Sequence, residues 1–154
     1  MSARPRALRS LAVLAACFLL VGCGRAGQPP SPTPADFSGM RDDLAAAGIT
    51  VANVLSGDAG CADPSLAKTA IAFDASGLDQ LQPVRIRVYI FRDRDAWQRL
   101  SAGVATCARS YVTDPATYES LAPSPYVVSG QGPWAAGFAA ALKTAFTAAA
   151  GSGD

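Results

Sequence analysis

The sequence contains no histidine, so any acid–base chemistry would depend on other residue types, carboxylates first among them. Histidine is the most common general base, a common metal ligand and the usual pH switch. Asp93 and Asp95 are the best candidates for a pair of catalytic carboxylates. However, they stand between a predicted strand and a predicted helix, where an N-cap aspartate and a second first-turn charge are typical. We favour that interpretation, and neither Lys68 nor Lys143 has the serine motif that a Ser–Lys nucleophile would need.

Arg85, Arg87 and Tyr89 form the one group of side chains that suits ligand binding. They alternate along the stretch VRIRVYIF, which places them on one face of a predicted strand. Two guanidinium groups and an aromatic ring suit an anionic or sugar ligand. The alternative, which we favour, is a charged and solvated sheet face without a ligand.

Cys61 and Cys107 remain as a pair once the cysteines of the N-terminal segment are set aside. In an exported chain such a pair predicts a disulfide. A redox-active pair would need a C-x-x-C spacing or neighbours that stabilise a thiolate, and a zinc site would need about four ligands. Neither pattern is evident, although two free thiols also remain an alternative. We expect a buried structural disulfide and no metal or other cofactor.

Periodic apolar residues predict the elements that position these side chains. Helical spacing begins at Phe37, with Asp36 as N-cap and Gly48 as the residue that ends the helix. Strands are predicted around 49–54, 68–73, 84–91 and 126–129 by their alternation of side chains. A second helix begins at Asp93 or Asp95. A last helix begins near Gly132-Pro133, with a buried stripe at Trp134, Phe138, Leu142 and Phe146.

The resulting fold class is α+β. We predict a two-layer sandwich, with a mostly antiparallel sheet of about four strands and with the helices on one face. The globular domain covers residues 36–150, and residues 151–154 form a flexible C-terminus. Residues 24–35 (GRAGQPPSPTPA) contain no large apolar side chain, so we expect an extended tether.

The N-terminal segment has the pattern of a secretory signal peptide over residues 1–22. Three arginines (Arg4, Arg6 and Arg9) precede the uncharged apolar run 11–21. That run is too short for a spanning helix, which needs about 20 apolar residues. Without those three arginines, ten basic residues face twelve acidic ones, a net charge of −2. A chain of this charge has no basic stripe for a nucleic-acid partner.

Leu20-Val21-Gly22-Cys23 resembles the lipobox of bacterial lipoproteins. The resemblance implies that the Cys23 sulfur receives a diacylglyceryl group and that cleavage makes Cys23 the first residue. Two acyl chains give a stable membrane anchor where one is marginal. An ordinary secreted protein with a cysteine near its cleavage site is the alternative.

The rest of the chain resembles small bacterial lipoproteins of uncharacterised function. The shared phrases are an opening F…L…LAAAG, the strand VRIRVYIF, an RD…DA helix start and the ending PYVVSGQGPWAAGFAAAL. This resemblance implies the fold and the bacterial envelope as location, and it implies no catalytic residues. We therefore expect a lipid-anchored protein at the extracytoplasmic face of the cell membrane, acting as a non-catalytic binding module for an envelope protein or glycan. The alternatives are an accessory subunit of an envelope complex and, third, an enzyme.

Overall fold

A computed structural model describes residues 37–151 of the 154-residue chain. The signal peptide, Cys23, the tether and the N-cap at Asp36 all lie outside the described residues, so these predictions remain predictions. The same holds for residues 152–154. Within residues 37–151, no helix has the length and apolar character needed to cross a membrane.

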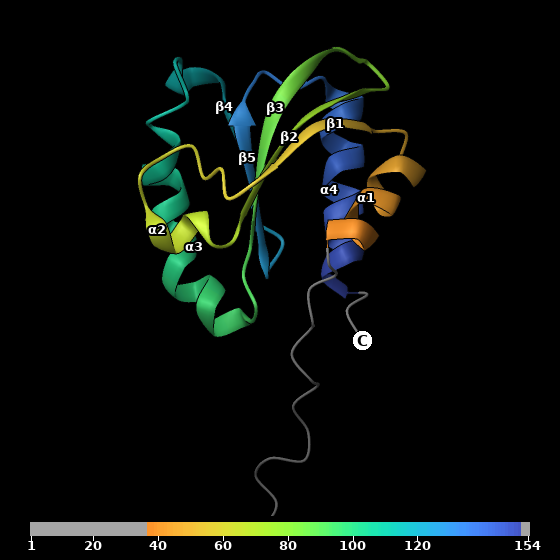
Figure 1. Cartoon of the computed structure of the whole chain (residues 1–154). Helices are drawn as coiled ribbons and strands as arrows, with labels where there is room; N and C mark the ends of the chain where they lie inside the picture. Colours follow the sequence, from red (N-terminus) through yellow and green to blue (C-terminus); the bar gives the residue numbers. More distant parts are fainter. Residues whose placement is uncertain (1–36, 152–154) are drawn as a thin grey trace, which may run out of the picture. The chain divides into compact units, whose positions relative to one another are not determined.

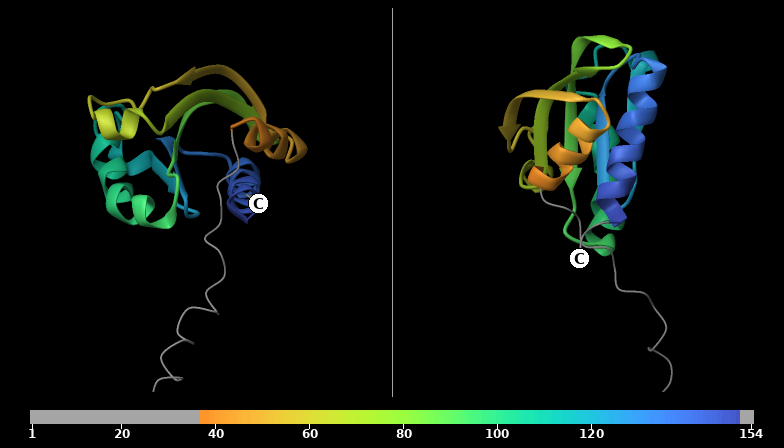
Figure 2. Two further views of the ribbon diagram at one scale, coloured as in Figure 1. Left: turned by 60° about the horizontal axis from the view of Figure 1, so that its bottom comes forward. Right: turned by 90° about the vertical axis from the view of Figure 1, so that its right-hand side faces the viewer.

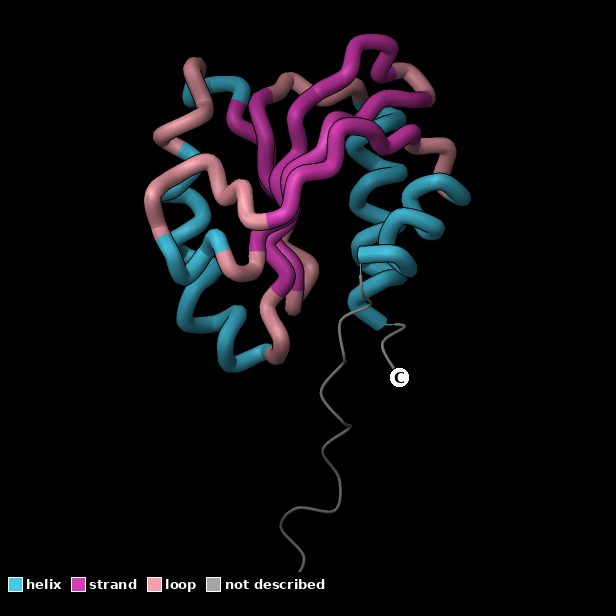
Figure 3. The backbone as a smooth tube through the Cα atoms, in the orientation of Figure 1, coloured by secondary structure: helices cyan, strands magenta, loops and turns pink. Residues whose placement is uncertain are grey.

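A five-stranded antiparallel sheet forms the centre of the domain (Figures 1 and 3). Its strands are β1 (Thr50–Ser56), β2 (Ala70–Gly77), β3 (Gln80–Ile90), β4 (Tyr118–Leu121) and β5 (Tyr126–Gln131). Their spatial order is β1-β2-β3-β5-β4, so β1 and β4 are the two edges. The predicted α+β class and antiparallel sheet are confirmed, with one strand more than expected. The additional strand, β4, has only four residues and too few alternations to be recognised in the sequence.

Two helices cover one face of the sheet. They are α1 (Phe37–Ala46) and α4 (Ala136–Gly151), which lie side by side in Figure 1. Met40 and Leu44 of α1 are fully buried in the same apolar cluster as Ile86 and Val88, which lie on the apolar face of β3. The alternation read from VRIRVYIF is therefore confirmed for this face.

Helix α4 contributes the predicted stripe of Phe138, Leu142 and Phe146, all fully buried. The helix begins at Ala136 rather than near Gly132-Pro133. Its first turn is fixed by Asp79, in the turn between β2 and β3, which accepts hydrogen bonds from the Gly137 and Phe138 amides at 2.8 and 2.7 Å. Because this carboxylate comes from far along the chain, no local pattern places the helix start.

The other face of the sheet carries a second pair of helices, as Figure 2 shows. They are α2 (Pro64–Ala67) and α3 (Arg94–Ala108). Asp93, one of the two predicted starts, is the N-cap of α3, and its side chain accepts a hydrogen bond from the Ala96 amide at 2.7 Å. The helices thus pack on both faces rather than on one. The reason is a second apolar cluster, centred on Tyr89, Phe91 and Val127, that needs its own cover.

The turn after α1 ends the helix in the predicted way. Gly48 has φ +81°, a left-handed conformation that favours glycine. Its amide donates to the Ala45 carbonyl at 3.0 Å, and the Ile49 amide donates to the Leu44 carbonyl at 2.9 Å. These two bonds direct the chain from α1 straight into β1.

Candidate functional site

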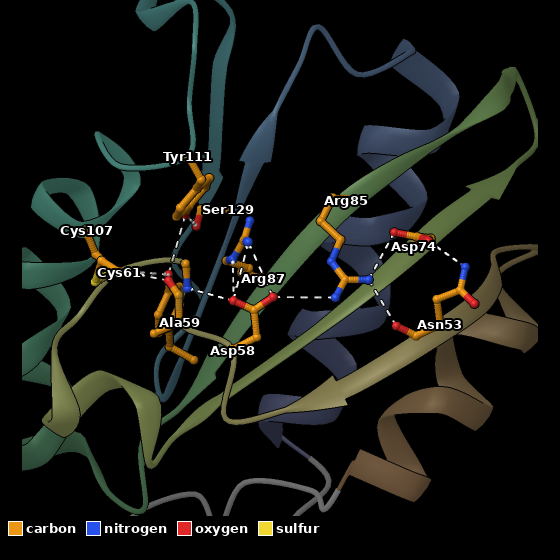
Figure 4. Close-up of polar contacts among 12 residues, drawn as sticks. Asn53, Asp58, Ala59, Cys61, Asp74, Arg85, Arg87, Cys107, Tyr111 and Ser129 are labelled. Atoms are coloured by element: carbon orange, nitrogen blue, oxygen red, sulfur yellow. Dashed lines mark hydrogen bonds and ion pairs between the residues drawn. A yellow bond between two sulfur atoms is a disulfide. The ribbon is translucent and has the colours of Figure 1, made fainter.

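The candidate site is a group of charged and polar side chains on the face of the sheet opposite α1 and α4. We call it the arginine network, and it consists of Asn53, Asp58, Asp74, Arg85, Arg87 and Tyr111 (Figure 4). Arg85 and Arg87 come from β3, as the sequence predicts. Their partners come from β1, β2, the loop after β1 and the segment after α3.

Arg85 is paired with Asp74, which lies directly opposite it on β2. Its Nη1 lies 3.1 Å from Asp74 Oδ1 and also donates to the Asn53 carbonyl at 3.0 Å. The Asn53 side chain also binds Asp74, since its Nδ2 donates a hydrogen bond to Asp74 Oδ2 at 2.7 Å. That bond lowers the pKa of Asp74, and Arg85 lowers it further by hydrogen bonding and charge against the opposing effect of burial.

Asp58 lies between the two guanidinium groups. Its Oδ2 is 3.5 Å from Arg85 Nη2 and 3.4 Å from Arg87 Nη2. Two carboxylates, those of Asp58 and Asp74, therefore balance two arginines. An anionic ligand would have to compete with these internal carboxylates, so the arrangement suits an uncharged polar ligand better than an anion.

Tyr111 provides the aromatic ring beside the arginines. The guanidinium carbon of Arg87 lies 4.1 Å from the ring centroid, a cation–π contact. The Tyr111 hydroxyl lies 2.7 Å from Oγ of Ser129, which is itself fully buried on β5. Sequence reasoning missed Tyr111, because it follows α3 and no pattern links it to β3.

Tyr89 shares the face of Arg85 and Arg87 as predicted, but it is not available to a ligand. Its side chain is fully buried in the cluster beneath α3, and its hydroxyl donates to the Ala59 carbonyl at 2.8 Å. Burial raises the pKa of Tyr89 far above its ordinary value. Alternation along a strand predicts the face on which a side chain lies but not whether a helix covers that face. Tyr89 is therefore not among the residues that could contact a ligand.

The loop after β1 is held in place over four consecutive residues, of which Asp58 and Ala59 bond to strand β3. Asp58 binds the arginines, the Ala59 carbonyl accepts from Tyr89, and the Gly60 amide donates to Asp58 Oδ1 at 2.8 Å. Gly60 has φ +76°, and a Cβ atom there would collide with Tyr111 and Arg87. The chain then reaches Cys61, so the loop is held by charge, hydrogen bonds and a covalent bond.

Cys61 and Cys107 form the predicted disulfide, with a Cα–Cα distance of 5.4 Å. Cys107 is buried as expected, whereas Cys61 is only half-buried. Both line an open hollow of about 610 Å³ beside Asp63. A carboxylate nearby and the position of Cys107 at the C-terminal end of α3 both disfavour a thiolate. The surroundings therefore favour a structural bond over a redox-active one.

The other catalytic candidates are not brought together. Asp93 caps the N-terminus of α3 and also forms an ion pair with Arg92, whose Nε lies 2.9 Å from Asp93 Oδ2. Asp95 is exposed to solvent in the first turn of α3. Lys68 ends α2, and Lys143 is exposed on α4. Within residues 37–151, no three carboxylate or cysteine side chains are placed to hold a metal ion. No protein-family model, curated protein or solved structure matches this chain.

Proposed function

We propose that this protein is exported, is anchored in a bacterial cell membrane by a lipid on Cys23, and acts at the extracytoplasmic face as a non-catalytic binding domain. The observation that carries the proposal is the Cys61–Cys107 disulfide, because such bonds persist in oxidising compartments outside the cytoplasm. The sequence LVGC at 20–23 supplies the lipid attachment point. The proline-rich tether at 24–35 would then hold the domain away from the membrane surface.

The ligand that best suits the arginine network is an uncharged glycan of the envelope. Asn53 is exposed, and the side chains of Arg85 and Asp74 are 32% and 28% exposed. Together they present donors and acceptors with no excess charge. Sugar hydroxyl groups both donate and accept hydrogen bonds, so they can bind such a surface without breaking its ion pairs.

An accessory subunit of an envelope complex is the second candidate. It is favoured by the exposed apolar side chains of Val54 and Leu55 on β1, which are 45% and 53% exposed. Apolar side chains gathered at a sheet edge are typical of protein contacts rather than of sugar sites.

Titration with soluble, uncharged oligosaccharide fragments built of N-acetylglucosamine, followed by NMR, tests the glycan proposal. We expect amide shifts at Asn53, Asp74 and Arg85. Arg85→Ala should weaken binding about tenfold or more, because charge-assisted hydrogen bonds are lost. The matched control is Arg99→Ala, which removes an exposed arginine from α3 and should leave binding unchanged. Absence of shifts at high fragment concentration, or equal loss in both variants, would contradict a glycan site at the network.

A further inference from the structure

Strand β1 leaves one edge of the sheet open. It is the first strand in the spatial order and pairs with β2 on one side only. Its seven residues, TVANVLS, include no charge and no proline. Edge strands in soluble proteins usually carry charged residues or proline, because an unprotected edge pairs with other strands. The one irregularity of β1 is a bulge between Ala52 and Leu55, where Asn53 has φ +51°.

Because of the bulge, the side chains of β1 point to the two faces of the sheet in the same order whether the strand is followed from its first residue or from its last. Val51 lies opposite Ala75, on the face covered by α1 and α4. Ala52 lies opposite Asp74, and the Asn53 side chain also reaches Asp74, so both belong to the other face. Leu55 lies opposite Ala72, also on that other face, and its neighbour Val54 therefore returns to the face of Val51.

We infer that β1 is a dimerisation edge, at which the β1 strand of a second copy adds in antiparallel orientation. The two-fold axis passes between Ala52 and Asn53. In this register Val51 of one copy stands directly across from Val54 of the other, and Thr50 from Leu55, so side chains on the same face meet. Such a contact is isologous, with the same strand used by both copies. Since β1 carries no charge, two copies bring no like charges into direct opposition.

A hollow beside β1 provides room for the second copy. It has a volume of about 370 Å³ and lies between α1 and the first half of β1. Its lining residues are Arg41, Ala45, Gly48, Ile49, Thr50 and Val51. In the proposed register the exposed Val54 of the second copy stands beside Val51 and can cover this hollow, which would remove apolar surface from water in both copies.

Cysteine cross-linking of the full chain in membranes tests the register. The double variant Val51→Cys with Val54→Cys should form a disulfide-linked dimer on mild oxidation, because the two positions face each other across the axis. Either single variant should not, because identical positions would stand three residues apart, or about 10 Å. Failure of the double variant to cross-link, or equal cross-linking of the single variants, would overturn the inference.

Sedimentation of the full chain in detergent provides a second measurement. Val54→Lys should weaken dimerisation about tenfold or more, since a charge would be buried at the contact. Leu81→Lys is the matched control: Leu81 is 82% exposed on β3, which β2 separates from the edge, so dimerisation should be unchanged. A monomeric wild-type chain, or equal weakening by both variants, would contradict the dimer. Neither measurement depends on the proposed glycan ligand.

Discussion

The Asp58 carboxylate lies against the guanidinium group of Arg87, with Oδ1 3.4 Å from both Nε and Nη2. This contact joins a loop to the middle of the sheet, and the side chains of Arg87 and Asp58 are only 13% and 23% exposed. Partial burial reduces screening by solvent, so the pair contributes more than a surface ion pair would. The arginine network thus fixes the loop as well as presenting a polar surface.

Asp58→Ala should lower the free energy of unfolding by about 1–3 kcal/mol, because it leaves two partly buried guanidinium groups without one of their carboxylates. Urea unfolding measures the change. Asp42→Ala is the control, since Asp42 is exposed on α1 and forms no ion pair among residues 37–151. An equal effect in the two variants would show that Asp58 does not hold the loop.

Gly60→Ala should destabilise the domain more than Gly57→Ala. Both glycines have a left-handed φ, +76° and +83°, so both substitutions carry a backbone cost of about 1–2 kcal/mol. Only at Gly60 would the new Cβ collide with Tyr111 and Arg87, whereas at Gly57 the nearest atom is 4.0 Å away. The difference in stability between the two variants, measured by thermal unfolding, gives the cost of the collision. This cost should add about 1–3 kcal/mol to the destabilisation by Gly60→Ala. Equal losses would mean that the loop moves freely away from Tyr111.

Loss of the disulfide should cost about 2–5 kcal/mol, mainly by releasing a constraint on the unfolded chain. The double variant Cys61→Ala with Cys107→Ala should therefore melt well below the wild type. Reducing agent should lower the melting temperature of the wild type and leave the variant unchanged. A wild type insensitive to complete reduction would contradict a stabilising role for the bond.

The stabilising effect of Asp79 should disappear in acid. Hydrogen bonds from the Gly137 and Phe138 amides lower its pKa in the folded state below the ordinary value of 3.8. A group of this kind stabilises the fold above its unfolded-state pKa, and the effect is lost as pH falls through the folded-state pKa. Wild type and Asp79→Ala should thus differ in unfolding free energy at pH 7, and the difference should shrink as the pH falls through the lowered folded-state pKa of Asp79. A constant difference across this range would exclude the charged cap.

Local patterns predicted the parts of the fold that depend on neighbours in sequence. The stripe of α4, the alternation of β3, the Asp93 cap and the turn at Gly48 all follow from spacings of a few residues. Helix α2 was missed because its four residues are too few for a helical period. The disulfide was predicted from the count of cysteines in a chain that we expected to be exported.

The arginine network was predicted only in part, because its partners are distant in sequence. The pattern placed Arg85 and Arg87 on one face but could not supply Asp58, Asp74 or Tyr111, which depend on strand register and on the loop. One signal in the sequence could have indicated the acidic partners. Two arginines on a partly buried strand need carboxylates nearby, and acidic residues in or beside the neighbouring strands were the candidates. The burial of Tyr89 had no such signal, since it depends on where α3 packs.

The central claim, an exported domain held at the membrane by Cys23, is tested most directly by the intact mass of the protein extracted from bacterial membranes. We predict a mature chain that begins at Cys23 and carries the added mass of a diacylglyceryl group. Cys23→Ala is the control and should leave an uncleaved or mislocalised chain without lipid. A wild-type chain that begins at Met1, or one whose Cys23 is unmodified, would contradict the claim.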